Sequence, residues 1–106
     1  GWDRHWGTDR YGDPGHPHVT GDGARALVAA GAALVGIDSV NIDDTTTGER
    51  PAHTLLLEAG VPIVEHLTRL GELPASGLHF TAVPPAIRGL ATFPVRAFAS
   101  VDDVQT

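Results

Sequence analysis

Twice in this chain a short helical pattern ends at a glycine and is followed at once by an apolar run. The first pattern ends at Gly31 and leads into residues 33–38, and the second ends at Gly60 and leads into residues 61–65. Glycine readily takes the left-handed conformation that ends helices, and a continuous apolar run is typical of a buried strand. This alternation of helix and strand predicts an α/β fold.

The expected helices also have recognisable starts. Thr20 or Asp22 offers an N-cap for the first helix, and Pro51 stands where the first turn of the second helix favours proline. Two more strands are expected over residues 78–83 and 93–101, because residues 78–83 alternate in the period-2 pattern of a strand with two unlike faces.

The first twenty residues have a different character, since they contain four glycines and two prolines. Such a segment cannot hold a long helix or a central strand, so residues 1–20 are predicted to form an ordered arm before an α/β core over residues 21–106. The strands are too few to close a doubly wound sheet. The chain also lacks methionine and starts at Gly1. We therefore expect residues 1–106 to be one portion of a single larger domain.

Composition excludes several classes of function. Thirteen acidic residues face seven arginines and no lysine, giving a net charge of −6, which argues against a nucleic-acid partner. Cysteine is absent, so disulfides, thiolate zinc sites and cysteine nucleophiles are excluded together. No apolar run approaches the roughly 20 residues that cross a bilayer, and no signal-peptide pattern opens the chain. The sequence therefore predicts a cytoplasmic protein without a membrane partner.

The candidate metal ligands are His53 and Glu65, twelve residues apart. A seven-residue helix advances about 10 Å and the following strand returns roughly 13–16 Å, so the reversal at Gly60 can bring the two side chains together. An imidazole with a carboxylate suits zinc, manganese or iron. Two ligands are fewer than catalytic zinc uses. The spacing alone leaves open a second interpretation, in which His53 is a polar residue at a helix start and Glu65 a solvated acid.

Two aspartates lie between the first strand and the second helix. Asp38 ends the expected buried strand, at the edge where open α/β sheets bind ligands, but it can equally cap the turn that follows. Asp43 and Asp44 lack the spacing and glycine of a calcium loop, and they are interpreted as part of a solvated turn.

Two further groups of residues offer weaker hypotheses. The arm carries a cluster of histidines and aspartates, although its glycines and prolines provide no rigid frame for metal ligands: His5, Asp9, Asp13, His16 and His18. A serine–histidine–aspartate triad is also open, but no serine lies in a G-x-S-x-G nucleophile elbow: Ser39, Ser76 and Ser100. His66 and His79 are interpreted as ordinary surface or packing residues.

Two motifs in the middle of the chain carry a resemblance to a known family. They are G-I-D-x-x-x-x-D, from Gly36 to Asp43, and H-x3-L-x7-E, from His53 through Leu57 to Glu65. With them the chain resembles the C-terminal half of the cyclase family of metal-dependent hydrolases, which includes bacterial kynurenine formamidase and isatin hydrolase. Weaker matches extend the resemblance over nearly the whole chain: Gly1-Trp2, His16-Pro17 and residues 93–99.

The resemblance implies a fold, a metal and a reaction. The family has an α/β fold with a swivelling β/β/α arrangement, usually forms homodimers, and binds one or two zinc or manganese ions. His53 and Glu65 match its C-terminal metal ligands, while Asp38 and Asp43 would organise their surroundings. The implied activity is hydrolysis of an aryl-formamide or cyclic amide, a small-molecule substrate, by metal-bound hydroxide.

The family's other ligands and its acid–base histidine come from an N-terminal motif, H-x-G-T-H-x-D-x-P. Residues 5–8 repeat its first half, but Asp9 and Tyr11 stand at the next two ligand positions. The resemblance thus implies that this chain supplies part of a metal site, is inactive alone, and has an N-terminal half of the same protein as a partner. Trp2 and Trp6 would line an aromatic substrate pocket or serve as packing anchors. The alternative is a non-catalytic metal-binding or interaction remnant of the same fold.

Overall fold

The computed structural model describes residues 1–102, which divide into two units, Gly1–Leu70 and a second unit that begins at Gly71. Helices and strands alternate in the first unit, so the predicted α/β class is confirmed. The elements follow in this order: η1 (Trp2–His5), η2 (Asp9–Gly12), α1 (Gly21–Ala29), β1 (Val35–Gly36), α2 (Pro51–Glu58), β2 (Ile63–Val64), η3 (Leu70–Glu72), β3 (Leu78–Val83) and β4 (Arg96–Val101). No helix among these residues is both long and apolar enough to cross a membrane.

Helix α1 begins and ends where its sequence predicts. The Thr20 hydroxyl accepts a hydrogen bond from the Gly23 amide at 3.0 Å, which makes Thr20 the N-cap. Gly31 follows the last turn with φ of 81°, the left-handed conformation that glycine adopts at little cost. Local sequence therefore determines both ends of this helix.

Helix α2 has the predicted proline in its first turn and is followed by Gly60 with φ of 76°. Its N-cap residue, Arg50, supplies no side-chain hydrogen bond. The first amides of a helix lack partners within the helix itself. For α2 those partners come from elsewhere in the chain, and they turn out to be part of the candidate site.

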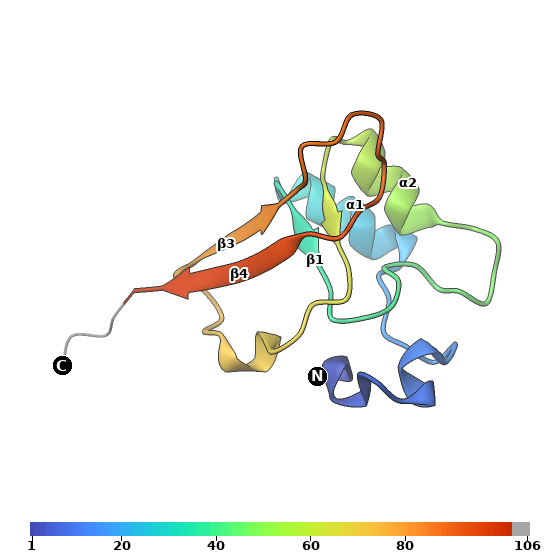
Figure 1. Ribbon diagram of the computed structural model, residues 1–106. Helices are drawn as coiled ribbons and strands as arrows, with labels where there is room; N and C mark the ends of the chain where they lie inside the picture. The colour runs from blue at the N-terminus through green and yellow to red at the C-terminus, as the bar shows by residue number, and fades with distance from the viewer. Residues whose placement is uncertain (103–106) are drawn as a thin grey trace. The chain divides into compact units, whose positions relative to one another are not determined.

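The first unit is built on one parallel strand pair. β1 and β2 pair in register Val35 to Ile63 and Gly36 to Val64, with α2 as the connection between them. The two helices pack side by side (Figure 1). A small core joins these elements, and its fully or nearly buried side chains come from both helices, both strand ends and the intervening loop: Ala24, Val35, Ile42, Ala52, Leu56 and Val61.

Both strands are shorter than the apolar runs that predict them. Pro62 has no amide hydrogen to donate to a ladder, and His66 leaves the extended conformation with a φ of 61°, so strand pairing is limited on both sides of β2. A strand needs a partner along its length, so β1 is limited by β2. The chain beyond β1, residues 38–50, runs as an irregular loop.

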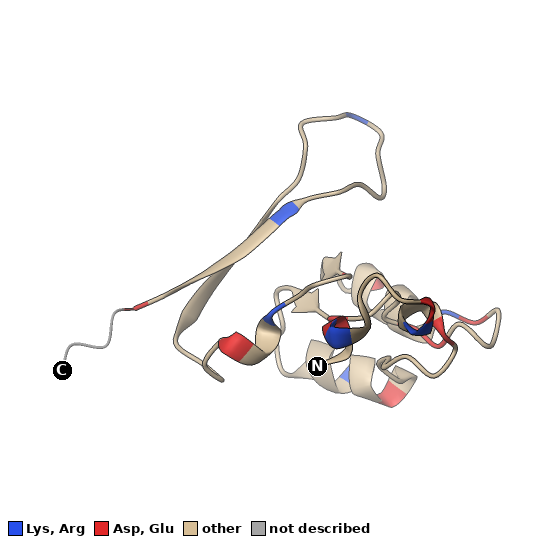
Figure 2. Ribbon diagram, turned by 60° about the horizontal axis from the view of Figure 1, so that its bottom comes forward, with Lys and Arg blue, Asp and Glu red and all other residues tan. Residues whose placement is uncertain are grey.

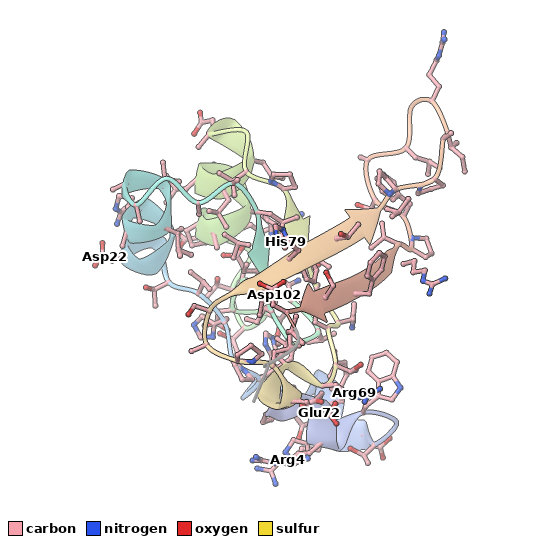
Figure 3. The ribbon with its side chains drawn as sticks, turned by 90° about the vertical axis from the view of Figure 1, so that its left-hand side faces the viewer. Arg4, Asp22, Arg69, Glu72, His79 and Asp102 are labelled. Carbon is pink, nitrogen blue, oxygen red and sulfur yellow. The ribbon has the colours of Figure 1, made fainter. Side chains whose placement is uncertain are left out.

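The second unit contains an antiparallel hairpin, in which β3 and β4 pair from Leu78–Val101 to Val83–Arg96. Alternate residues of β3 are half-buried and exposed, as its period-2 pattern predicts. His79 is one of the exposed residues on this strand (Figure 3). The hairpin carries very few charges, as Figure 2 shows. Strand β4 begins at Arg96 instead of residue 93, because Pro94 has no amide hydrogen to donate to the strand ladder.

Candidate functional site

The candidate site is centred on His53, which lies in the first turn of α2. Its Nδ1 atom is 2.7 Å from Asp43 Oδ2, and its Nε2 atom is 3.6 Å from Glu65 Oε2. His53 is 15% exposed, Asp43 2% and Glu65 25% at the side chain. The structure therefore brings together both predicted metal ligands and one of the two aspartates expected to organise them.

Asp43 has a second task beside orienting His53. Its Oδ1 accepts the Ala52 amide at 2.7 Å and its Oδ2 accepts the His53 amide at 2.9 Å. These are amides of the first turn of α2, whose own N-cap residue provides no side-chain acceptor. Asp43 thus caps α2 from a loop eight residues upstream, where its negative charge also faces the positive end of the helix dipole.

These contacts decide the charge of Asp43. Burial by itself would raise the pKa of this carboxyl, but the two amides and the His53 ring outweigh burial and hold the pKa below its usual range. An ionised carboxylate only accepts hydrogen bonds. Nδ1 of His53 must therefore carry the ring proton, and in the neutral ring the lone pair is on Nε2, the atom that faces Glu65.

Glu65 follows β2 and is held by the same loop. Its Oε2 accepts the Ile42 amide at 2.7 Å, so Ile42 holds Glu65 on one side of His53. The next loop residue, Asp43, contacts His53 on the other side. The 3.6 Å between His53 Nε2 and Glu65 Oε2 is too long for a hydrogen bond. Two ligands of one tetrahedral zinc ion, each about 2.0–2.2 Å from the metal, lie about 3.3–3.6 Å apart. The donor pair and its spacing therefore fit a divalent ion.

His53 and Glu65 account for only part of the coordination sphere of a metal ion. Catalytic zinc usually has three protein ligands. Within residues 1–102 no group of three or more histidine, aspartate and glutamate side chains is arranged to hold an ion. His53 and Glu65 alone would leave positions for further ligands.

Asp38 is placed away from this hydrogen-bond set. Its Oδ2 accepts the Trp2 amide at 3.0 Å and the Gly1 nitrogen at 2.7 Å. It thereby anchors the arm to the loop after β1, the kind of local role that the sequence left open for it. Its influence on His53 would be indirect.

The two tryptophans lie within the arm. Trp2 donates from its indole to the Tyr11 carbonyl at 2.9 Å, with its ring 4.6 Å from that of His5. Trp6 is 58% exposed and makes edge contacts with Tyr11 and His66. Trp2 is therefore tied into the arm, while Trp6 offers an exposed aromatic face beside the residue that follows Glu65.

Tyr11 and His66 form a contact that the sequence did not reveal. Tyr11 Oη lies 3.0 Å from His66 Nδ1, and Tyr11 is nearly buried. Burial first, and then the carboxylates of Asp38, Asp3 and Glu65, raise the pKa of the Tyr11 hydroxyl. His66 has a left-handed backbone, which turns the chain after Glu65. Neither composition nor periodicity predicts this turn, so the sequence carried no signal for the contact.

The three serines of the triad hypothesis belong to different units of the chain. Ser39 is fully buried, with its hydroxyl 2.9 Å from Nδ1 of the equally buried His16, so it has no access to a substrate in this conformation. Ser76 and Ser100 belong to the second unit, where Ser100 pairs with His79 across the hairpin.

The chain is 37% identical over 76 residues to a protein named kynurenine formamidase from Salinibacter ruber (strain DSM 13855 / M31). The match covers 72% of this chain and 35% of the relative, so the chain spans about a third of the length of the relative it matches. No protein-family model matches the chain. No solved structure matches it significantly.

Proposed function

We propose that this chain contributes two ligands, His53 and Glu65, to the divalent-metal site of an amide hydrolase of the formamidase type. One observation carries the proposal: Asp43 fixes the proton of His53 on Nδ1, which directs the Nε2 lone pair toward a carboxylate oxygen 3.6 Å away. Two electron-pair donors that face each other without a proton between them suit a cation. The similarity to a kynurenine formamidase supports the reaction class.

Each residue has a stated part in this proposal. His53 would bind zinc or manganese through Nε2 and Glu65 through its carboxylate, while Asp43 holds the His53 ring and raises its basicity. When bound, such an ion polarises an amide carbonyl and activates water near neutral pH. The Ile42 amide keeps Glu65 Oε2 directed at the same point. The exposed ring of Trp6 would contact an aromatic part of the substrate.

The remaining ligands and the acid–base histidine would come from a segment with the motif H-x-G-T-H-x-D-x-P. The alternative function, a non-catalytic metal-binding or interaction module, is favoured by the lack of a three-ligand cluster within residues 1–102. The two proposals differ in hydrolysis, and only the metal-binding form of the alternative shares the metal.

The metal is tested by elemental analysis after dialysis against zinc or manganese. We expect near-stoichiometric metal in the wild type, and a loss of affinity of roughly tenfold or more in His53→Ala and Glu65→Gln. His79→Ala and Glu58→Gln are the matched controls, because both residues are exposed and neither takes part in the hydrogen bonds of the site. Unchanged metal content in His53→Ala would refute the site.

Hydrolysis is tested separately, by formate release from formanilide with the metal-loaded protein and a polypeptide that carries the missing motif. Formate release that disappears in His53→Ala supports the hydrolase. Stoichiometric metal without formate release in that mixture supports the non-catalytic alternative.

A further inference from the structure

His16 is a buried histidine that the proposed metal site does not use. It is only 2% exposed, and both of its ring nitrogens have partners. Nδ1 lies 2.8 Å from the Pro17 carbonyl oxygen and 2.9 Å from Ser39 Oγ, and Nε2 lies 3.1 Å from Thr45 Oγ1. The Pro17 carbonyl only accepts, so Nδ1 carries the proton, and the neutral ring accepts the Thr45 hydroxyl at Nε2.

The two side chains that form hydrogen bonds with His16 bracket one loop. Ser39 and Thr45 stand at the ends of a seven-residue segment that contains no helix or strand. Between them, the Ile42 amide binds Glu65 and the Asp43 carboxylate binds His53. A single buried imidazole therefore spans the loop that positions both proposed metal ligands.

The loop has other restraints, and none of them joins its two ends. The His66 amide donates to the Ser39 carbonyl at 3.0 Å, which holds the start of the loop to the residue after Glu65. The Val19 amide donates to the Ile42 carbonyl at 2.7 Å, which holds the middle of the loop to the arm. Asn41 Oδ1 accepts the Asp43 amide at 2.8 Å, which is a local turn within the loop. Only the His16 contacts connect residue 39 with residue 45 among the hydrogen bonds described for this segment in residues 1–102.

We propose that His16 is a positioning residue: by holding Ser39 and Thr45 together, it keeps Asp43 on Nδ1 of His53 and so keeps the Nε2 lone pair directed at Glu65. The inference rests on the proposed function for its consequence, metal affinity. Its immediate effect, the orientation and tautomer of His53, exists in the metal-free protein. The two can therefore fail separately.

The experiment removes one of the two His16 contacts, with Thr45 or with Ser39, at a time. Thr45→Val deletes, at an exposed position, the hydroxyl that donates to Nε2 of His16, and Thr45→Ser restores that hydroxyl. Ser39→Ala removes the partner at Nδ1. Thr47→Val is the matched control, since Thr47 is exposed in the same stretch and its hydroxyl only accepts the Glu49 amide at 3.3 Å.

The first readout is the ¹⁵N spectrum of the His53 ring in metal-free protein, which reports which nitrogen carries the proton. We expect Thr45→Val and Ser39→Ala to reduce the Nδ1–H form of His53 and to lower zinc affinity about tenfold, the lower end for partners that orient metal ligands. Thr45→Ser and Thr47→Val should match the wild type in both.

A His53 ring signal that is unchanged in both Thr45→Val and Ser39→Ala would overturn the inference, whatever the zinc affinity. A changed ring signal, in a protein that binds no zinc even as wild type and together with the polypeptide that carries the missing motif, would sustain the inference and refute the metal site. Urea unfolding of each variant separates a local change at His53 from a loss of the fold.

Discussion

Asp43→Asn tests the double role of the buried aspartate, which caps α2 and holds His53. Asparagine keeps the size of the side chain but replaces one acceptor oxygen with an amide group that donates. Asp43 receives three hydrogen bonds, one at Oδ1 and two at Oδ2. Whichever way the asparagine is turned, its NH₂ group must face one backbone N–H of the first turn, either that of Ala52 or that of His53.

The magnitude follows from two losses. A buried N–H left without an acceptor costs about 1–3 kcal/mol. Losing the negative charge at the helix N-terminus costs about 0.3–1 kcal/mol more, and up to about 2 kcal/mol in a partly buried geometry. We therefore expect Asp43→Asn to lower the free energy of unfolding by about 2–4 kcal/mol, which is a fall in Tm of at least about 10 °C for a domain of this size.

Urea unfolding at several pH values is the assay, with Asp22→Asn as control. Asp22 also lies in a first helical turn, but its side chain is exposed (Figure 3), and its replacement should cost within about 0.5 kcal/mol. The folded-state pKa of Asp43 is lowered, so its contribution is present at neutral pH and is lost as the pH falls below about 4 and through that pKa. The gap between wild type and variant should close in that range. A gap under about 1 kcal/mol at pH 7, or one that persists at acid pH, would refute the assigned role.

The remaining predictions concern the arm and the core. Tyr11→Phe removes the hydrogen bond to His66 and should cost about 0.5–1.5 kcal/mol. Because the folded-state pKa of Tyr11 is raised, its contribution is present below about pH 10 and is lost as the pH rises through that pKa; equal alkaline loss in wild type and variant, in a denaturant series, would contradict this. Leu56→Ala, at a fully buried position, should cost about 2–5 kcal/mol, whereas Leu57→Ala, 56% exposed on the next position of the same helix, should cost within about 0.5 kcal/mol in urea unfolding. Similar losses in the two leucine variants would show that the core is not where the structure puts it.

The helices were predictable because their causes are local. Thr20 caps α1 through its own hydroxyl, Pro51 fits the first turn of α2, and Gly31 and Gly60 supply the left-handed conformation after each helix. Each of these effects acts within about four residues, so it can be inferred from the order of the amino acids. The same holds for the period-2 alternation of residues 78–83.

The spacing of His53 and Glu65 also allowed their proximity to be predicted. A helix, a reversal at Gly60 and a strand bring the chain back beside the start of the helix, where His53 lies. Spacing could not say which nitrogen of His53 faces Glu65. That is decided by Asp43, whose loop has no periodicity to predict its course. Asp43 was interpreted from sequence as part of a solvated turn as well as a neighbour of the ligands, and the structure buries it to 1% exposure.

By itself, then, the sequence determined the α/β class, the two helices with their ends, and the candidate ligand pair. Tertiary structure alone decided that an irregular loop would cap α2, that His16 would be buried across that loop, and that Tyr11 would reach His66. The physical reason is that these contacts join residues 9 to 55 positions apart. Hydrogen bonds over such separations depend on where packing places whole segments, and no local rule of spacing, propensity or capping carries that information.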